Sequence, residues 1–209
     1  MPGTHDLILF IAAGLLLNVT PGADTLYIVS RSTAQGAGAG AVAALGIGAG
    51  CIVHVVAAAA GLSALLAASA TAFSTLKYVG AAYLLYLGAT MLFASAGRQP
   101  LPAMVPGTSL ARVFLGGVLT NVLNPKVALF FLAFLPQFIA PDAQAKWKSM
   151  LLLGLVFDLN GTLWNLVVAW SSARLSGRFA RRPALSRWLR RLCGGVFVWF
   201  CIRLARSEA

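Results

Sequence analysis

Long apolar segments are the feature that most restricts how this chain can fold. Six of them are separated by short polar or basic stretches, and they cover residues 7–30, 39–68, 73–93, 110–139, 147–173 and 192–202. A helix needs about 20 predominantly apolar residues to cross the hydrocarbon core of a bilayer. Only 10% of the residues are charged, whereas about a quarter are charged in a typical soluble domain. The sequence therefore predicts an all-α integral membrane protein with six transmembrane helices.

The sixth segment is the weakest of the six. Residues 192–202 alone are too few to cross about 30 Å of hydrocarbon. A full span requires the helix to begin near Pro183, with Arg187, Arg190 and Arg191 extending their side chains to the interface. Five spans plus one interfacial helix is the alternative.

The basic residues predict the orientation of the chain in the membrane. The net charge is +11, and most lysines and arginines follow the first, third and fifth segments, above all in the block 174–191. Loops rich in these residues stay in the cytoplasm, so both termini are expected on the opposite side. A nucleic-acid partner is not expected, because it would require aromatic residues interleaved with the basic ones on an exposed platform.

Proline interrupts the first and the fourth segments at corresponding places. The first interruption is Pro21, followed by Gly22, in NVTPGAD, and the second is Pro125 in NVLNPK. Proline removes one backbone hydrogen bond of a helix and clashes with the preceding turn. Freed backbone groups in lipid must find partners, so both helices are expected to break where they face protein or water. The polar side chains expected to cap the freed groups are Asn18, Thr20, Asn121 and Asn124.

The two breaks occupy matching positions in two halves of the chain. A proline-rich linker at 98–108 separates residues 1–97 from residues 109–209, with three predicted spans in each half. Because three is an odd number, the second half must enter the membrane upside down relative to the first. The sequence therefore predicts two inverted three-helix repeats, and interrupted helices at matching positions of such repeats point to a transporter's substrate site.

Ionisable side chains occur inside four of the predicted spans. Asp24 and Lys126 follow the two breaks, while His54 and Asp158 lie near the centres of the second and fifth spans. Burying an ionised side chain at this depth costs about 2.5–3.5 kcal/mol on insertion scales, so these residues are candidates for function. The structural alternatives are an ion pair between Asp24 and Lys126 and a neutral, hydrogen-bonded His54.

These groups match the two charged ends of a free amino acid. The helices that start after the breaks direct their positive dipole ends at them, and together with Lys126 they can hold a carboxylate. Asp24 or Asp158 can hold the ammonium group, and the other aspartate can then exchange a proton. This is the minimum set of groups for antiport of a substrate against protons.

No enzyme, metal or cofactor motif accompanies these residues in the sequence. GxSxG, HExxH and P-loop motifs are missing, as is any cysteine–histidine spacing typical of a metal site. Cys51, Cys193 and Cys201 all lie in apolar segments and are interpreted as packing residues. Gly46 and Gly50 form a close-packing motif that suits either packing within the chain or a homodimer interface.

At these positions the sequence resembles the LysE/RhtB family of bacterial amino-acid exporters, and the resemblance extends over nearly the whole chain. It rests on the segments NVTPGADTLYIVSRSTAQGAGAG, ALGIGAGCIVHVVAAAAGLSALL, LKYVGAAYLLYLGATML, TNVLNPKVALFFLAFLPQF and RRPALSRWLRRLCGG. The resemblance implies efflux of amino acids or their derivatives across the bacterial inner membrane, driven by the proton gradient. In that membrane, the charge distribution of the loops would place both termini in the periplasm. An exporter of a small ion on a related scaffold and a non-transporting membrane subunit are the alternatives.

Overall fold

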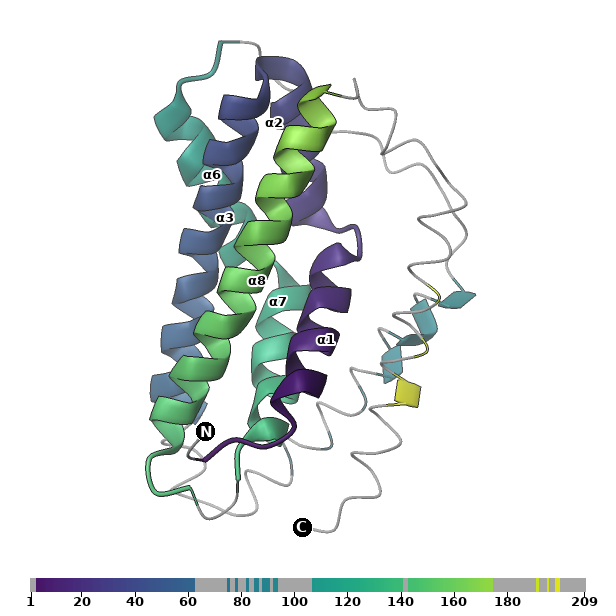
Figure 1. The fold of residues 1–209 in the computed structure, drawn as a ribbon, viewed down its shortest axis with the longest axis vertical. Helices are drawn as coiled ribbons and strands as arrows, with labels where there is room; N and C mark the ends of the chain where they lie inside the picture. The colour runs from purple at the N-terminus through teal and green to yellow at the C-terminus, as the bar shows by residue number, and fades with distance from the viewer. Residues whose placement is uncertain are drawn as a thin grey trace.

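The described chain consists of helices, apart from one isolated bridge between Thr4 and Ile139 (Figure 1). The computed structural model describes residues 3–62, 107–140 and 143–174, together with isolated helical positions within 75–93 and 191–199. The predicted third and sixth spans, the linker at 98–108 and the basic block at 174–191 lie wholly or largely outside the described residues.

Six α-helices and three shorter helical turns follow one another within the described residues. The α-helices are α1 (Leu7–Val19), α2 (Ala23–Gln35), α3 (Ala37–Ala57), α6 (Leu110–Val122), α7 (Pro125–Leu129) and α8 (Lys146–Arg174). The π-helical turn η1 (Ala58–Leu62) continues α3, and α7 is continued by the π-helical turn η2 (Phe130–Phe134) and the 3₁₀ turn η3 (Leu135–Phe138).

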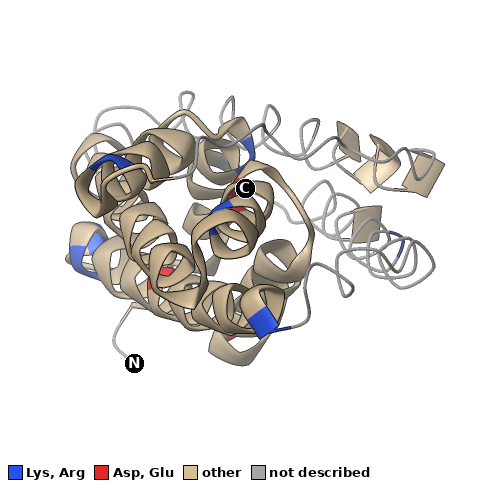
Figure 2. Ribbon diagram, turned by 90° about the horizontal axis from the view of Figure 1, so that it is seen from above, with Lys and Arg blue, Asp and Glu red and all other residues tan. Residues whose placement is uncertain are grey.

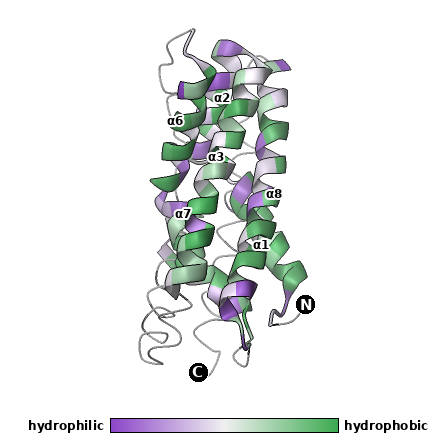
Figure 3. Ribbon diagram, turned by 90° about the vertical axis from the view of Figure 1, so that its left-hand side faces the viewer, coloured by the Kyte–Doolittle hydropathy of each residue, from purple (hydrophilic) through white to green (hydrophobic). Residues whose placement is uncertain are grey.

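Up to four membrane spans are present among the described residues. Two helices are long and apolar enough by themselves, namely α3 with its extension over Ala37–Gly61 and α8. Two more result if each bent pair counts as one span: α1 with α2, bent by 53°, and α6 with Pro125–Phe138, bent by 45°. Charged positions are few along these helices, and apolar residues follow most of their length (Figures 2 and 3). The prediction of an all-helical membrane protein with two proline-broken helices is thus confirmed, whereas the six-helix inverted repeat stays a prediction.

The two broken spans run antiparallel to each other. At one end, the backbone N–H of His5 donates to the carbonyl oxygen of Phe138 at 3.1 Å. At the other end, Gln35 Nε2 donates to the carbonyl oxygen of Thr108 at 2.9 Å. Each end of the first broken span therefore meets the opposite end of the second, with α1 near α7 and α2 near α6 (Figure 1). An inverted arrangement of the two halves requires this antiparallel placement.

Glycines let α3 approach the backbone of α6. A Cβ atom added to Gly46 would collide with the carbonyl oxygen of Phe114, and one added to Gly50 would lie 2.7 Å from the carbonyl oxygen of Val118. From the other side, a Cβ atom on Gly117 would lie 2.6 Å from the carbonyl oxygen of Ala43. The motif Gly46-x-x-x-Gly50 thus serves packing within the chain, which was one of its two predicted uses.

We expect Gly46→Ala to lower the free energy of unfolding by about 1–3 kcal/mol, because the added methyl group overfills a backbone contact. Gly38→Ala is the matched control in the same helix, since a Cβ atom added to Gly38 would meet no other atom within 4 Å. This control should be neutral or stabilising by up to about 1 kcal/mol through the higher helix propensity of alanine. Unfolding in mixed detergent, followed by circular dichroism, measures both. Equal effects of the two substitutions would contradict this role of Gly46.

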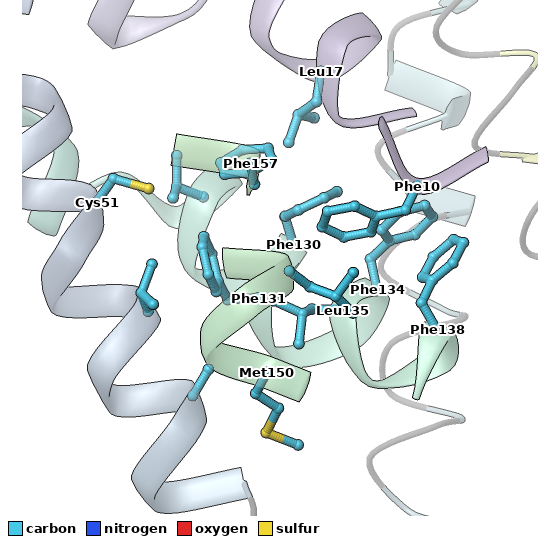
Figure 4. Close-up of a cluster of buried hydrophobic side chains, with 14 of the residues drawn as sticks. Phe10, Leu17, Cys51, Phe130, Phe131, Phe134, Leu135, Phe138, Met150 and Phe157 are labelled. Carbon is cyan, nitrogen blue, oxygen red and sulfur yellow. The ribbon is translucent and has the colours of Figure 1, made fainter. Parts of the chain in front are cut away.

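The largest side chains of the buried core are phenylalanines around the second half of the fourth span (Figure 4). They come from α1, η2, η3 and α8, and they are Phe10, Phe130, Phe131, Phe134, Phe138 and Phe157. Ring centroids of Phe130 and Phe157 lie 4.4 Å apart in a stacked arrangement. Within the predicted span 110–139, the chain changes to π-helical and 3₁₀ turns after α7. Pro136 explains the change, because it cannot donate the hydrogen bond that an α-helix needs at that position.

Candidate functional site

The first break leaves backbone carbonyl groups without the donors that a continuous helix would supply. α1 ends at Val19, and α2 begins at Ala23 after Pro21 and Gly22. Pro21 has no N–H, so the carbonyl group of Leu17, four residues earlier, loses its helical partner. The hydroxyl of Thr20 donates to Leu16 at 2.7 Å, which satisfies an acceptor within α1 and not one at the break.

Lys126, from the second broken span, supplies the missing donor. Its Nζ atom donates to the carbonyl oxygens of Leu17 and Thr20, both at 3.1 Å. It also lies close to Gly22, where an added Cβ atom would be 3.3 Å from Nζ. A positive charge at the C-terminal end of a helix such as α1 is favourable. The two breaks are thus joined by one side chain, which is half-buried.

The second break is capped by its own residues. Asn124 precedes α7, and its Oδ1 atom accepts a hydrogen bond from the backbone N–H of Lys126 at 3.0 Å. Pro125 occupies the first turn of α7, where a missing N–H does not matter. The backbone N–H of Asn124 donates to the carbonyl oxygen of Asn121 at 2.9 Å. The predicted capping role of Asn124 is confirmed.

Asp24, Asn121 and His54 form a polar chain across α2, α6 and α3. The Nδ2 atom of Asn121 donates to Oδ2 of Asp24 at 3.0 Å. His54 Nε2 lies 3.1 Å from the carbonyl oxygen of Asn121, so this ring nitrogen carries the hydrogen. The His54 ring also stacks on Phe131 at 6.0 Å. His54 is therefore hydrogen-bonded, as the structural alternative for this residue expected.

Asp24 and Lys126 come near each other without forming a close ion pair. The carboxylate of Asp24 interacts electrostatically with Lys126 and His54 and lies beside the amides of Asn121 and Asn124. Within the described part of the chain, however, no ion pair of 4.0 Å or less joins Asp24 to Lys126. The structure thus brings five polar side chains of the predicted site together around the two breaks, namely Asp24, His54, Asn121, Asn124 and Lys126.

Four buried polar atoms at the breaks have no hydrogen-bond partner in the described chain. They are Asn18 Nδ2, Asp24 Oδ1, Asn121 Oδ1 and Asn124 Nδ2. The orientations of two amides are fixed, because only the NH₂ group of Asn121 can donate to a carboxylate and only the oxygen of Asn124 can accept from an N–H. The unpartnered atom of Asn121 is therefore its side-chain oxygen, an acceptor, and that of Asn124 is its side-chain nitrogen, a donor. Buried polar atoms are usually satisfied, so this concentration of unpartnered atoms is unusual.

Asn18 does not cap the first break, contrary to the prediction. α2 has no hydrogen bond from a capping side chain. The amide of Asn18 lies against Gly161 of α8 instead, and a Cβ atom added to Gly161 would be 3.0 Å from Asn18 Nδ2. Asn121 also differs from the prediction. Its side-chain amide donates to Asp24, and only its backbone carbonyl oxygen accepts a hydrogen bond at the break, from the N–H of Asn124. Both side chains act between helices because the antiparallel spans place partners beside them.

Asp158 lies apart from the two breaks, between α8 and α3. Its carboxylate lies beside the thiol of Cys51 and the hydroxyl of Thr162. A Cβ atom on Gly48 would lie 3.5 Å from Asp158 Oδ1 and 2.6 Å from Thr162 Oγ1, so a glycine is needed opposite this pair. Cys51 is buried.

The position of Cys51 beside Asp158 was missed by the sequence analysis, which assigned the residue to packing. One signal was available, since Cys51 precedes His54 by three residues and therefore shares a helix face with it. Within 3–62, 107–140 and 143–174 and the isolated positions, no group of three or more histidine, cysteine or acidic residues is arranged to hold a metal ion.

Comparison with known proteins shows similarity along nearly the whole chain. Residues 15–208 match the family described as LysE type translocator. An uncharacterized membrane protein of Vibrio cholerae is 31% identical over 209 residues, which cover 98% of this chain and 98% of that protein. A leucine efflux protein of Salmonella choleraesuis is 29% identical over 203 residues, which cover 96% of this chain and 94% of that protein. No solved structure matches the chain significantly.

Proposed function

Because the chain belongs to the LysE type translocator family, we propose that it exports amino acids or amino-acid derivatives across a bacterial inner membrane in exchange for protons. Membership of a translocator family favours transport over catalysis. The relatives named as leucine efflux proteins support an amino-acid substrate in general. The further elements of the proposal are six spans in two inverted repeats, 1–97 and 109–209, and both termini in the periplasm.

The observation that carries this proposal is the set of unpartnered donors and acceptors at the two breaks. A buried polar atom without a partner destabilises a protein by about 1–3 kcal/mol, and water is scarce inside a bilayer. The acceptors Asp24 Oδ1 and Asn121 Oδ1 suit an ammonium group, while the donor Asn124 Nδ2 suits a carboxylate. A zwitterion would satisfy both kinds of atom at once.

The charges near the breaks fit the same ligand. Asp24 offers a carboxylate to the substrate's ammonium group. Lys126 and the first N–H groups of α2, which follow Gly22, can attract the substrate's carboxylate. Asn18, Thr20, Pro21 and Pro125 shape the breaks in this proposal, and His54 holds Asn121 in position.

Transport of an amino acid by the purified protein tests the proposal directly. Proteoliposomes loaded with an unlabelled mixture of the common amino acids are diluted into the same mixture carrying a radiolabel. We expect the label of at least one amino acid to accumulate by counterflow, above the level in protein-free liposomes. A growth screen of overproducing cells against each amino acid should then show selective resistance to the same compound.

Two other outcomes have defined meanings. Uptake of metal ions in place of amino acids by the same vesicles would support a small-ion exporter, and the absence of any counterflow would support a non-transporting subunit. Either result would overturn the proposal.

A further inference from the structure

The first break directs two backbone carbonyl oxygens at a cation that comes from the other broken span. Residue 21 is proline, so the carbonyl oxygen of Leu17 loses the donor that a continuous helix would supply. Thr20 lies between α1 and α2 with an extended backbone, at φ −68° and ψ 117°, so its carbonyl group is turned out of the helical direction. Lys126 Nζ lies 3.1 Å from both oxygens. Carbonyl groups at unwound points of membrane helices are known ligands of cations.

The number and distance of these oxygens suit an ammonium group. An N–H donor lies about 2.7–3.2 Å from its acceptor, and the two contacts of 3.1 Å fall in this range. An ammonium group has three N–H donors, so it can serve both carbonyl groups at once. Ca²⁺ and Mg²⁺ instead require about six or more oxygens at roughly 2.0–2.6 Å. The first break therefore matches a primary ammonium ion better than a bare metal ion.

The surroundings leave room for the ammonium end of Lys126 and hold the base of its side chain. A Cβ atom added to Gly22 would lie 3.3 Å from Nζ and 3.7 Å from Cε, so a larger residue at this position would crowd the charged group. At the other end, the backbone N–H of Lys126 donates to Oδ1 of Asn124 at 3.0 Å. The side chain thus extends from a fixed point at the second break into a space that the first break keeps open.

We infer that the first break is a binding site for a primary ammonium ion, and that Lys126 fills it as a cation tethered to the second broken span. The protein therefore needs no free cation at this place, and removal of the side chain creates a site for one. Binding of the cation does not depend on transport, whereas its effect on export rests on the proposed function.

Thermal unfolding of the purified Lys126→Ala variant in detergent tests the inference. The substitution removes three carbon atoms and the ammonium group, and n-propylammonium consists of the same heavy atoms. We expect n-propylammonium chloride, at ten times its dissociation constant, to raise the midpoint of unfolding of this variant by about 3–6 °C. The wild type should not respond, because its site is filled. Lys126→Met should not respond either, because the methionine side chain occupies the space without donating.

Three other salts at the same concentration separate ammonium binding from a general effect of charge. Tetramethylammonium has the same charge but no N–H donor, and sodium and potassium are bare ions. The midpoint of Lys126→Ala should rise with n-propylammonium and not with these three. No rise with n-propylammonium, or equal rises with all four salts, would overturn the inference. A larger rise with sodium or potassium would overturn it too, because the break would then be a metal-ion site.

The test also covers a variant that does not survive purification. In that case Lys126→Ala is compared in isolated membranes, where n-propylammonium should increase its resistance to protease. Lys148→Ala, at an exposed lysine, is the control and should not respond. Failure of n-propylammonium to protect Lys126→Ala would count against the site as clearly as an unchanged unfolding midpoint.

Counterflow in proteoliposomes separates this inference from the proposed function. With n-propylammonium at equal concentration on both sides, amino-acid counterflow through Lys126→Ala should rise from background to at least about a tenth of the wild-type rate, which corresponds to recovering all but about 1.4 kcal/mol of the lost stabilisation. If the wild type shows no counterflow, the proposed function is wrong, and the unfolding experiment alone decides on the cation site. If the wild type transports but n-propylammonium restores nothing, the cation has no part in export.

Discussion

Replacing Asp24 by asparagine should strongly reduce amino-acid export and exchange while leaving the protein folded in the membrane. Asparagine has nearly the same shape and still offers an oxygen to Asn121, whose Nδ2 atom lies 3.0 Å from Asp24 Oδ2. The lost interaction is the charge-assisted hydrogen bond to the substrate's ammonium group. Such bonds contribute about 1.5–3 kcal/mol, so affinity should fall about 10- to 100-fold. Counterflow in proteoliposomes measures the loss.

Asp6→Asn is the matched control for this prediction. Asp6 is an exposed carboxylate that lies 3.4 Å from the ring of His5, and its backbone has a left-handed conformation that asparagine tolerates well. The control should transport normally. If Asp24→Asn exported at the wild-type rate with equal amounts in the membrane, Asp24 would have no part in substrate binding.

Replacing Lys126 by methionine should affect both stability and transport. Methionine has a similar volume but cannot donate to the carbonyl oxygens of Leu17 and Thr20, which Lys126 Nζ reaches at 3.1 Å. Each carbonyl left without a donor costs about 1–3 kcal/mol, so the free energy of unfolding should fall by roughly 2–6 kcal/mol. Asp24 would also lose its nearby positive charge, and export should cease. Unfolding in mixed detergent and counterflow give the two measurements.

Lys148→Met serves as the control for the substitution itself. Lys148 is exposed near the start of α8, where its ammonium group lies 5.5 Å from the ring centroid of Trp147. Exposed substitutions of this kind change stability by about 0.5 kcal/mol or less. A stability loss of Lys126→Met no larger than that of Lys148→Met would show that the first break does not depend on this side chain.

The broken helices could be predicted from the sequence because their causes are local. Pro21 with Gly22, and Pro125 after Asn124, act on the backbone within one turn, whatever the rest of the chain does. The effect of Pro136 was equally local, but its position near the end of an apolar segment hid it. The π-helical and 3₁₀ turns of residues 130–138 were therefore not predicted.

The partners of the polar residues could not be predicted in the same way. Lys126 binds the end of α1 and Asn121 binds Asp24 because two spans distant in sequence lie antiparallel with their breaks adjacent. Nothing in the local sequence of either break specifies the register between them. Cys51 was missed for the same reason, since its position beside Asp158 depends on which face of α8 packs against α3.

The contact between α3 and α6 limits how the protein can change shape. These helices belong to different halves of the sequence, yet Gly46, Gly50 and Gly117 bring their main chains together. Sliding one helix past the other would push a side chain into this close backbone contact, so α3 and α6 should move together as one rigid unit. The transport cycle of the proposed exporter would therefore have to leave this contact unchanged.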